Sequence, residues 1–189
     1  MRLASNVCML CVLYYHVTLR KRSSKAFKAN LLILHLHTHT GINKCDLVET
    51  SPRLINAAPE YIGEDRIKCK FICEGLQDFH PQADTYDIIW VQWVIGYLTD
   101  WDLCNFFHRM GKALRQGGVI IVKDNTCNDL AFMADKGDSD VTRSFQYLMA
   151  IVRESGLKIV KAENGKDFIR WQDDFPDSIW PVPMIALTM

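Results

Sequence analysis

The sequence predicts an α/β fold with a mostly parallel sheet, and two observations indicate it. From Cys45 onward, strand-like segments alternate with helix-like segments, which is the order of elements in α/β proteins. Most strand candidates are short continuous apolar runs, as expected for strands that are covered on both faces. A chain of 189 residues, 49% of them hydrophobic, is long and apolar enough for one domain with its own core.

The strand candidates are bounded by turn residues and by helix-like segments. Six of them are predicted, at residues 45–48, 68–73, 86–91, 118–122, 157–161 and 184–187. The first predicted helix runs from Ser51 to Tyr61, because Ser51 is a suitable N-cap and Pro52 is favoured at the first helical position.

Two further helices are predicted from capping residues and apolar periodicity. One begins at Thr99 and runs to about Leu114, because Asp102 stands three residues after Thr99 and approximates a capping box. The other runs from about Ser139 to Glu154, before Gly156. Its apolar positions fall on one helical face: Val141, Phe145, Leu148, Ile151 and Val152.

The first 44 residues do not continue this order. The run LLILHL at 31–36 is typical of a buried strand, but only eight residues separate it from the strand at Cys45. A parallel crossover needs a dozen or more residues. The first glycine of the chain is Gly41, so no Gly-rich turn of the GxGxxG type precedes it. We therefore expect an atypical segment, residues 1–44, before an α/β domain, residues 45–189, with an incomplete first βαβ unit.

The balance of charge argues against two classes of partner. With 22 basic and 22 acidic residues, the chain has no global positive field to attract nucleic acid or anionic lipid. The apolar stretch Cys8–Leu19 is shorter than the roughly 20 residues that span a bilayer. The sequence RKRSSK follows it, where a signal peptide would have a small-residue cleavage site. Seven scattered cysteines fit reduced thiols, so we expect an intracellular protein.

Two clusters have the residue types of metal ligands. Cys8 and Cys11 have the CxxC spacing of half a zinc site or of a redox pair, but no second CxxC follows. His35, His37 and His39 alternate, which on a strand would place them on one face; the alternative is chance spacing in an irregular segment. We favour chance and predict no metal site.

Polar and aromatic residues follow several predicted strands, at the edge where α/β sheets bind ligands. Glu49 ends the strand CDLVE, where a carboxylate can accept hydrogen bonds from both ribose hydroxyls, although acids at strand ends are common. In the loop Gly75–Phe79, glycine permits a tight turn whose backbone and amide groups can bind an adenine edge; an ordinary loop is the alternative. Trp93 and Tyr97, four residues apart, either line a pocket or pack together.

Three motifs, in this order, carry a specific resemblance. GLQDF, YDIIWVQWVIGYLTD and GGVIIVKDN resemble the protein α-N-terminal methyltransferases, which methylate the free amino group of chains beginning Xaa-Pro-Lys. The resemblance runs from about Cys45 to the C-terminus, roughly three quarters of the chain. WVQWVIG and VKDN are its most specific parts, because generic methyltransferases of this fold do not share them. The resemblance implies a Rossmann-like class I fold and S-adenosylmethionine as the cofactor.

The resemblance assigns cofactor-binding roles to four residues. The acidic ribose ligand of the family falls on Glu49. Its adenine-proximal loop falls on Leu76 and Gln77, and its glutamine beside the methionine part of the cofactor falls on Gln92.

The resemblance also assigns a peptide pocket. The tryptophan that packs against the peptide's proline matches Trp93, and the asparagine that holds its first residues matches Asn125. The acidic cluster facing the amine and the third-position lysine corresponds to Asp135 and Asp138, across a one-residue insertion. Methyl transfer to nitrogen is an in-line displacement that needs a neutral, aligned amine. Asp138 can orient the ammonium and accept its proton, directly or through water.

The chain departs from the family in two places. Tyr97 stands where the family has a histidine proposed to help deprotonate the amine, and a tyrosine with a pKa near 10 is a poor base near neutrality. We therefore expect Asp138, with Asn125 and Tyr97, to make up the catalytic site, with a lower rate or a higher pH optimum. The Gly-rich cofactor loop and the strand before it have no counterpart before Cys45, so we expect a bare sheet edge there.

The sequence thus predicts an S-adenosylmethionine-dependent enzyme acting on protein N-termini that begin Ala/Pro/Ser-Pro-Lys. By resemblance it is a protein of the nucleus and cytoplasm. We expect a monomer, and the charge balance and the short apolar stretch argue against binding to nucleic acid or membrane. Two alternatives remain open. One is an impaired chain of this family that binds Xaa-Pro-Lys termini without methyl transfer, and the other is a small-molecule methyltransferase of the same fold.

Overall fold

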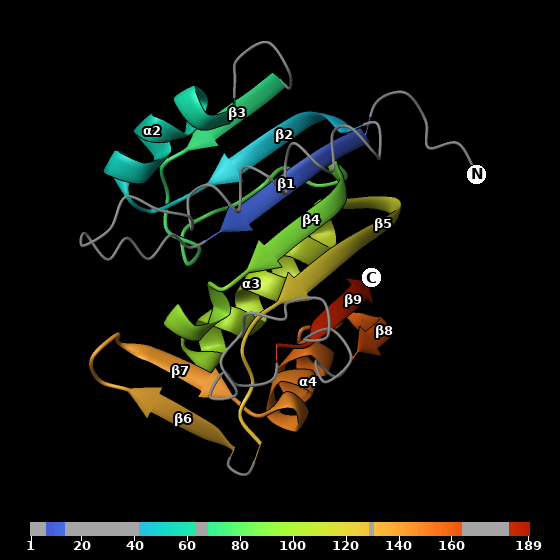
Figure 1. The fold of residues 1–189 in the computed structure, drawn as a ribbon. Coiled ribbons are helices and arrows are strands. Elements are labelled where there is room, and N and C mark those ends of the chain that lie inside the picture. The colour runs from blue at the N-terminus through green and yellow to red at the C-terminus, as the bar shows by residue number, and fades with distance from the viewer. Residues whose placement is uncertain (1–6, 14–41, 63–67, 129–130, 164–181) are drawn as a thin grey trace.

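A computed structural model describes residues 7–13, 42–62, 68–128, 131–163 and 182–189, and within them a seven-stranded sheet forms the centre of the molecule (Figure 1). Its strand order is β3-β2-β1-β4-β5-β9-β8. The strands are β1 (Val7–Leu13), β2 (Ile42–Val48), β3 (Lys68–Ile72), β4 (Tyr86–Gln92), β5 (Leu114–Lys123), β8 (Lys158–Glu163) and β9 (Met184–Thr188). Strands β1 to β5 pair in parallel, whereas β9 is antiparallel to both β5 and β8. The predicted mostly parallel sheet is confirmed.

Strand β1 is the main difference from the sequence-based expectation. It lies between β2 and β4 and pairs in parallel with both, so that Met9 stands opposite Cys45 on one side and Ile88 on the other. The expectation of a bare sheet edge is therefore wrong, because VCMLCVL fills the central position. The predicted boundary after residue 44 falls inside β2, and the strand predicted at 31–36 lies outside the described residues.

The alternation of side chains along β1 explains why this run is a central strand. Cys8, Leu10 and Val12 belong to one core cluster, with residues of the helices α3 (Asp100–Ala113) and α4 (Phe145–Glu154). Val7, Met9 and Cys11 belong to the other, with residues of α2 (Pro52–Ile62). The six residues are all buried, so both faces of β1 are covered. Helices α3 and α4 therefore cover one face of the sheet and α2 covers the other.

The helix boundaries follow their capping residues. Helix α3 begins after Thr99, whose side chain accepts a hydrogen bond from the backbone N–H of Asp102 at 3.2 Å, as the sequence predicts. Helix α2 begins at Pro52, with the carbonyl of Ser51 accepting from the N–H of Ile55 at 3.0 Å. In the described ranges, no helix has the length and apolar character needed to cross a membrane.

The third helix begins later than its apolar periodicity predicts. Residues 139–143 are not helical: β7 (Asp140–Arg143) pairs with β6 (Phe132–Asp135) in an antiparallel hairpin. Helix α4 begins only after Ser144, whose hydroxyl accepts a hydrogen bond from the N–H of Tyr147 at 3.2 Å. The predicted start at Ser139 is therefore wrong, because cross-strand pairing takes the residues that precede the cap.

Candidate functional site

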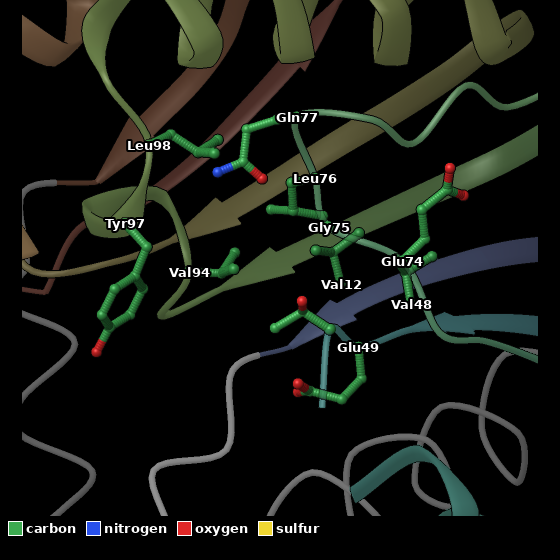
Figure 2. Close-up of a pocket in the computed structure, with 11 residues that line it drawn as sticks. Val12, Val48, Glu49, Glu74, Gly75, Leu76, Gln77, Val94, Tyr97 and Leu98 are labelled. Carbon is green, nitrogen blue, oxygen red and sulfur yellow. The ribbon is translucent and has the colours of Figure 1, made fainter. Parts of the chain in front are cut away.

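A cavity of about 200 Å³ lies at the carboxyl ends of β1, β2 and β4 (Figure 2). The ends of these strands and the loops that follow them form its wall: Val12, Val48, Glu49, Thr50, Glu74, Gly75, Leu76, Gln77, Val94, Tyr97 and Leu98. The carboxyl edge of a parallel sheet is the edge where open α/β folds bind ligands, because loops from adjacent strands converge there. The cavity is the candidate binding site.

Glu49 is the buried acid of this cavity. Only 4% of the residue is exposed, directly after β2. Its backbone N–H donates to the carbonyl of Ile72 at 3.1 Å, and its Oε1 accepts from the N–H of Ser51 at 2.8 Å. These two bonds fix the residue between the ends of β2 and β3. A buried carboxylate beside apolar walls is suited to accept hydrogen bonds from ligand hydroxyl groups.

The loop 75–79 after β3 forms another part of the wall. The carbonyl of Gly75 accepts from the N–H groups of Asp78 at 3.1 Å and Phe79 at 3.0 Å, which closes a tight turn. Leu76 is buried against the core and lines the cavity, as does the exposed Gln77. Arg109 of α3 donates to three carbonyls of this loop.

A buried carboxylate, Asp124, fixes the turn that follows β4. Its Oδ2 accepts from the N–H groups of Val94 at 2.9 Å and Ile95 at 3.1 Å. Its Oδ1 accepts from the N–H of Asn125 at 2.8 Å. Burial raises the pKa of Asp124 to about 6, although these three hydrogen bonds favour the charged form. The turn leads into the 3-10 helix η1 (Ile95–Tyr97), which places Tyr97 on the cavity.

Tyr97 connects the cavity to the β6–β7 hairpin. Its Oη donates to Oδ2 of Asp138, at 3.0 Å, in the turn between the two strands. In Figure 2 the side chains of Glu49 and Tyr97 extend toward the lower part of the view, away from the loop that carries Leu76. Near this contact, burial and the charges of Asp138 and Asp135 raise the pKa of Asp140. The hairpin thus presents clustered carboxylates next to the cavity.

The predicted site residues fall into two groups. Four of them line the cavity: Glu49, Leu76, Gln77 and Tyr97. The other predicted residues do not line it, although Asp138 reaches it through Tyr97: Gln92, Trp93, Asn125, Asp135 and Asp138. The structure therefore places three of the four residues assigned to the cofactor on one cavity, together with Tyr97, whereas the residues assigned to the peptide do not line it.

The residues outside the cavity have partners of their own. The side chain of Gln92 accepts a hydrogen bond from Nε1 of Trp90 at 3.0 Å. Trp93 has a positive φ of 53°, and Nζ of Lys123 lies 5.5 Å from the centroid of its ring. Oδ1 of the exposed Asp135 accepts from the N–H of Gly137 at 2.7 Å.

Asp124 and Arg109 are not among the site residues that the sequence predicts. Asp124 belongs to the KDN motif, which is the signal that could have identified it, whereas no local pattern marks Arg109.

The structure does not bring the candidate metal ligands together. Cys8 and Cys11, which have the spacing of half a zinc site, point to opposite faces of β1 and so do not form a pair. Within the described ranges no group of three or more His, Cys, Asp or Glu residues is placed to hold a metal ion. The histidines at 35, 37 and 39 lie outside these ranges.

The strand order is that of a class I, Rossmann-like methyltransferase. A solved S-adenosylmethionine-dependent methyltransferase from Leishmania major superposes with a TM-score of 0.74 and 25% sequence identity, covering 98% of this chain and 67% of that one. The sequence model of the family described as "AdoMet dependent proline di-methyltransferase" matches residues 26–188, and the chain belongs to this family. The predicted fold class and family resemblance are confirmed.

The curated relatives of this chain carry a more specific name. The N-terminal Xaa-Pro-Lys N-methyltransferase 1-B of Xenopus laevis is 36% identical over 143 residues, which are 75% of this chain and 60% of the relative. The corresponding protein of Danio rerio is 39% identical over the same shares of the two chains. The chain thus spans about 60% of the length of these relatives.

The family uses S-adenosylmethionine, so the cavity can be tested for fit to this cofactor. The buried carboxylate of Glu49 provides acceptors for ribose hydroxyls, and the apolar side chains of Val12, Val48 and Leu76 suit a flat base. These residues fit the nucleoside part. The residues that follow β1, where class I folds bind the amino-acid part, lie outside the described ranges.

Proposed function

We propose that this chain is an S-adenosylmethionine-dependent methyltransferase that acts on the free α-amino group of proteins beginning Ala/Pro/Ser-Pro-Lys. The observation that carries the proposal is the 3.0 Å hydrogen bond from Tyr97 to Asp138. It joins the cavity proposed for the nucleoside part of the cofactor to a carboxylate on the adjacent hairpin, where we place the peptide. A methyltransferase needs its cofactor site and its substrate site side by side, because the methyl group passes directly from one to the other. The relatives' name supplies the substrate class.

Four residues hold the cofactor in this proposal. Glu49 accepts hydrogen bonds from the ribose hydroxyls, Leu76 and Gln77 contact the adenine, and Gln92 lies beside the methionine part. S-adenosylmethionine, when bound, supplies a methyl group on a sulfonium. The burial of Glu49 and the cavity that it shares with Leu76 and Gln77 support the first three roles.

The peptide occupies the neighbouring turn and hairpin. Trp93 packs against the proline, Asn125 holds the first residues, and Asp135 and Asp138 face the amine and the third-position lysine. An α-amino group has an unperturbed pKa near 7.7 to 8.0, so a fraction is neutral at physiological pH. Asp138 orients the ammonium and accepts its proton, directly or through water, while Tyr97 acts as a hydrogen-bond donor to this carboxylate.

The remaining parts of the proposal rest on the family resemblance. We propose protein substrates, a monomeric enzyme and a location in the nucleus and the cytoplasm, without direct binding to nucleic acid or membrane. The charge balance of 22 basic and 22 acidic residues supports the absence of nucleic-acid binding.

One observation favours a second candidate function. No glycine occurs between β1 and Gly41, although a Gly-rich turn at this place provides backbone donors for the cofactor in Rossmann-like folds. A chain without these donors could bind Xaa-Pro-Lys termini through Trp93, Asn125 and Asp138 and transfer no methyl group.

A titration separates the two functions. S-adenosylmethionine is titrated calorimetrically into the purified chain and into two variants, Glu49→Ala and the control Glu60→Ala, whose exposed carboxylate lies on α2 away from the cavity. Binding that is lost in Glu49→Ala and kept in Glu60→Ala supports the proposed enzyme, and methylation of a Ser-Pro-Lys peptide, followed by mass spectrometry, completes the test. Binding of this peptide by a folded chain that does not bind the cofactor would establish the second candidate.

A further inference from the structure

The guanidinium of Arg109 donates three hydrogen bonds to the loop 75–79, which carries the cavity-lining residues Leu76 and Gln77. It lies on α3 and is only partly exposed. Its Nη2 donates to the carbonyls of Leu76 at 2.7 Å and Gln77 at 3.1 Å, and its Nε donates to the carbonyl of Phe79 at 3.1 Å. Burial lowers the pKa of Arg109, and the charges of the nearby Asp102 and Asp78 oppose this shift.

These three bonds determine how the loop 75–79 faces the cavity. Leu76 and Gln77 line the cavity while their carbonyls point to α3, so this part of the loop lies between the helix and the cavity. All described peptide bonds are trans, and in a trans peptide the carbonyl and the N–H point in opposite directions. Holding the carbonyl of Leu76 on Arg109 therefore turns the N–H of Gln77 away from α3, toward the cavity.

We propose that Arg109 is a positioning residue for base recognition: it holds the loop 75–79 so that the backbone N–H of Gln77 meets an acceptor nitrogen on the edge of a purine. This inference rests on the proposed use of S-adenosylmethionine. Adenine has an acceptor nitrogen on its pairing edge where hypoxanthine carries an N–H. A correctly placed backbone donor therefore favours adenine, and a loop that is free to turn loses this preference.

The test compares two ligands that differ only in the base, S-adenosylhomocysteine and S-inosylhomocysteine. Arg109→Met removes all donors but keeps an unbranched apolar stem. Arg115→Met is the matched control, because Arg115 is more exposed and bonds Asp87 at 2.8 Å, away from the cavity. Binding of both ligands is measured by calorimetry on the whole chain. We expect Arg109→Met to lower the affinity for S-adenosylhomocysteine about tenfold and the affinity for S-inosylhomocysteine much less. The preference for adenine over hypoxanthine would then fall about tenfold.

Hydrogen exchange gives a second measurement that needs no ligand. The amides of Asp78 and Phe79, which donate to Gly75, are expected to exchange faster in Arg109→Met than in the unsubstituted chain and in Arg115→Met. Arg109→Lys keeps one cationic donor group and is expected to restore part of the adenine preference, which a purely structural loss would not show.

Three outcomes decide the question. A preference that falls in Arg109→Met and returns partly in Arg109→Lys supports the inference. An equal loss of affinity for both ligands, or unchanged exchange in the loop, overturns it while leaving the proposed function intact. If the unsubstituted chain binds neither ligand, the proposed function fails and this inference fails with it, whatever the exchange shows.

Discussion

Two buried carboxylates at the carboxyl edge of the sheet, Glu49 after β2 and Asp124 after β5, are used in different ways. Glu49 is 4% exposed, lines the cavity and accepts a backbone N–H from Ser51 through Oε1. Asp124 is 8% exposed, does not line the cavity and accepts three backbone N–H groups. The same topological position thus places one carboxylate on the wall of the cavity and ties the other to the backbone of a turn.

The difference has a physical cause in the strands that surround each acid. β5 ends beside the turn after β4, where Trp93 has a positive φ and the following N–H groups point inward to Asp124. These N–H groups need a buried acceptor, because a buried donor without one costs free energy. β2 ends beside the cavity instead, so Glu49 faces space that a ligand can fill.

Asp124→Ala removes the acceptor for three backbone donors. We expect the free energy of unfolding to fall by about 3 kcal/mol, because buried unsatisfied N–H groups cost roughly 1–3 kcal/mol each and the turn relaxes in part. Urea unfolding followed by circular dichroism measures this change. Glu49→Ala is the comparison, and we expect it to lower the free energy of unfolding by less than half as much. An equal loss of stability in both variants would contradict the proposed difference between the two carboxylates.

The raised pKa of Asp124 makes stability depend on pH in a predictable direction. Its pKa is about 6 in the folded chain and near 3.8 in the unfolded chain. Between pH 3.8 and about pH 6, the folded chain therefore holds a proton on Asp124 that the unfolded chain has lost. Stability from this group is therefore present below about pH 4 and is lost as the pH rises through about 6. The full shift corresponds to about 3 kcal/mol.

Other carboxyl groups also titrate in this window, so a matched variant isolates the effect. The pKa of Asp100 is lowered by its hydrogen bonds to Tyr147 and Arg143, against the opposing effect of burial, and its contribution runs the opposite way. Asp124→Asn keeps the shape of the side chain but does not titrate. The unfolding free energy of the unsubstituted chain, relative to that of Asp124→Asn, should fall from pH 4 to pH 6.5; a constant difference between the two would contradict the raised pKa.

Glu49→Gln tests the ligand side of the contrast. The amide keeps one oxygen for Ser51 or for a ligand but loses the charge, so we expect the affinity for S-adenosylmethionine to fall about thirtyfold, or about 2 kcal/mol. The unfolding midpoint should change little. Glu60→Gln, on the exposed side of α2, is the control for a lost negative charge. A strong loss of stability with unchanged affinity for S-adenosylmethionine would show that Glu49, like Asp124, serves to hold the backbone and does not bind the ligand.

The sequence predicts what depends on neighbours in the chain. The N-cap at Thr99 and the side chain of Asp102 three residues later determine the start of α3 locally, and this prediction is confirmed. The position of Glu49 also follows from a strand end, and the motifs GLQDF and VKDN identify the family. These features could be predicted because each lies within a few residues.

The sequence does not predict what depends on distant partners. VCMLCVL becomes the central strand only because β2 and β4 pair with it on both sides, and β4 begins more than 70 residues later. Residues 140–143 have helical periodicity, yet cross-strand pairing makes them β7. The role of Asp124 depends on N–H groups of Val94 and Ile95, about 30 residues away. Propensity and periodicity contain no information about such pairing.

Tyr97 contacts both the cavity that Glu49 lines and the hairpin carboxylate Asp138. Substitutions at this position therefore test whether the two regions act together. Tyr97→Phe keeps the ring and removes the hydrogen bond. We expect kcat/KM for a Ser-Pro-Lys peptide to fall about fivefold, or about 1 kcal/mol, with the KM for S-adenosylmethionine nearly unchanged. A fall in cofactor affinity alone would mean that Tyr97 serves the cavity and does not position Asp138.

Tyr97→His replaces the phenol by a group that titrates near neutrality. An imidazole next to Asp138 can accept the amine proton at physiological pH, so we expect the rate near pH 7 to rise and the pH optimum to fall relative to the unsubstituted chain. The measurement is the rate of peptide methylation from pH 6 to pH 9.5. An unchanged dependence of the rate on pH would show that Asp138 removes the proton without help from position 97, and that tyrosine at this position does not lower the rate.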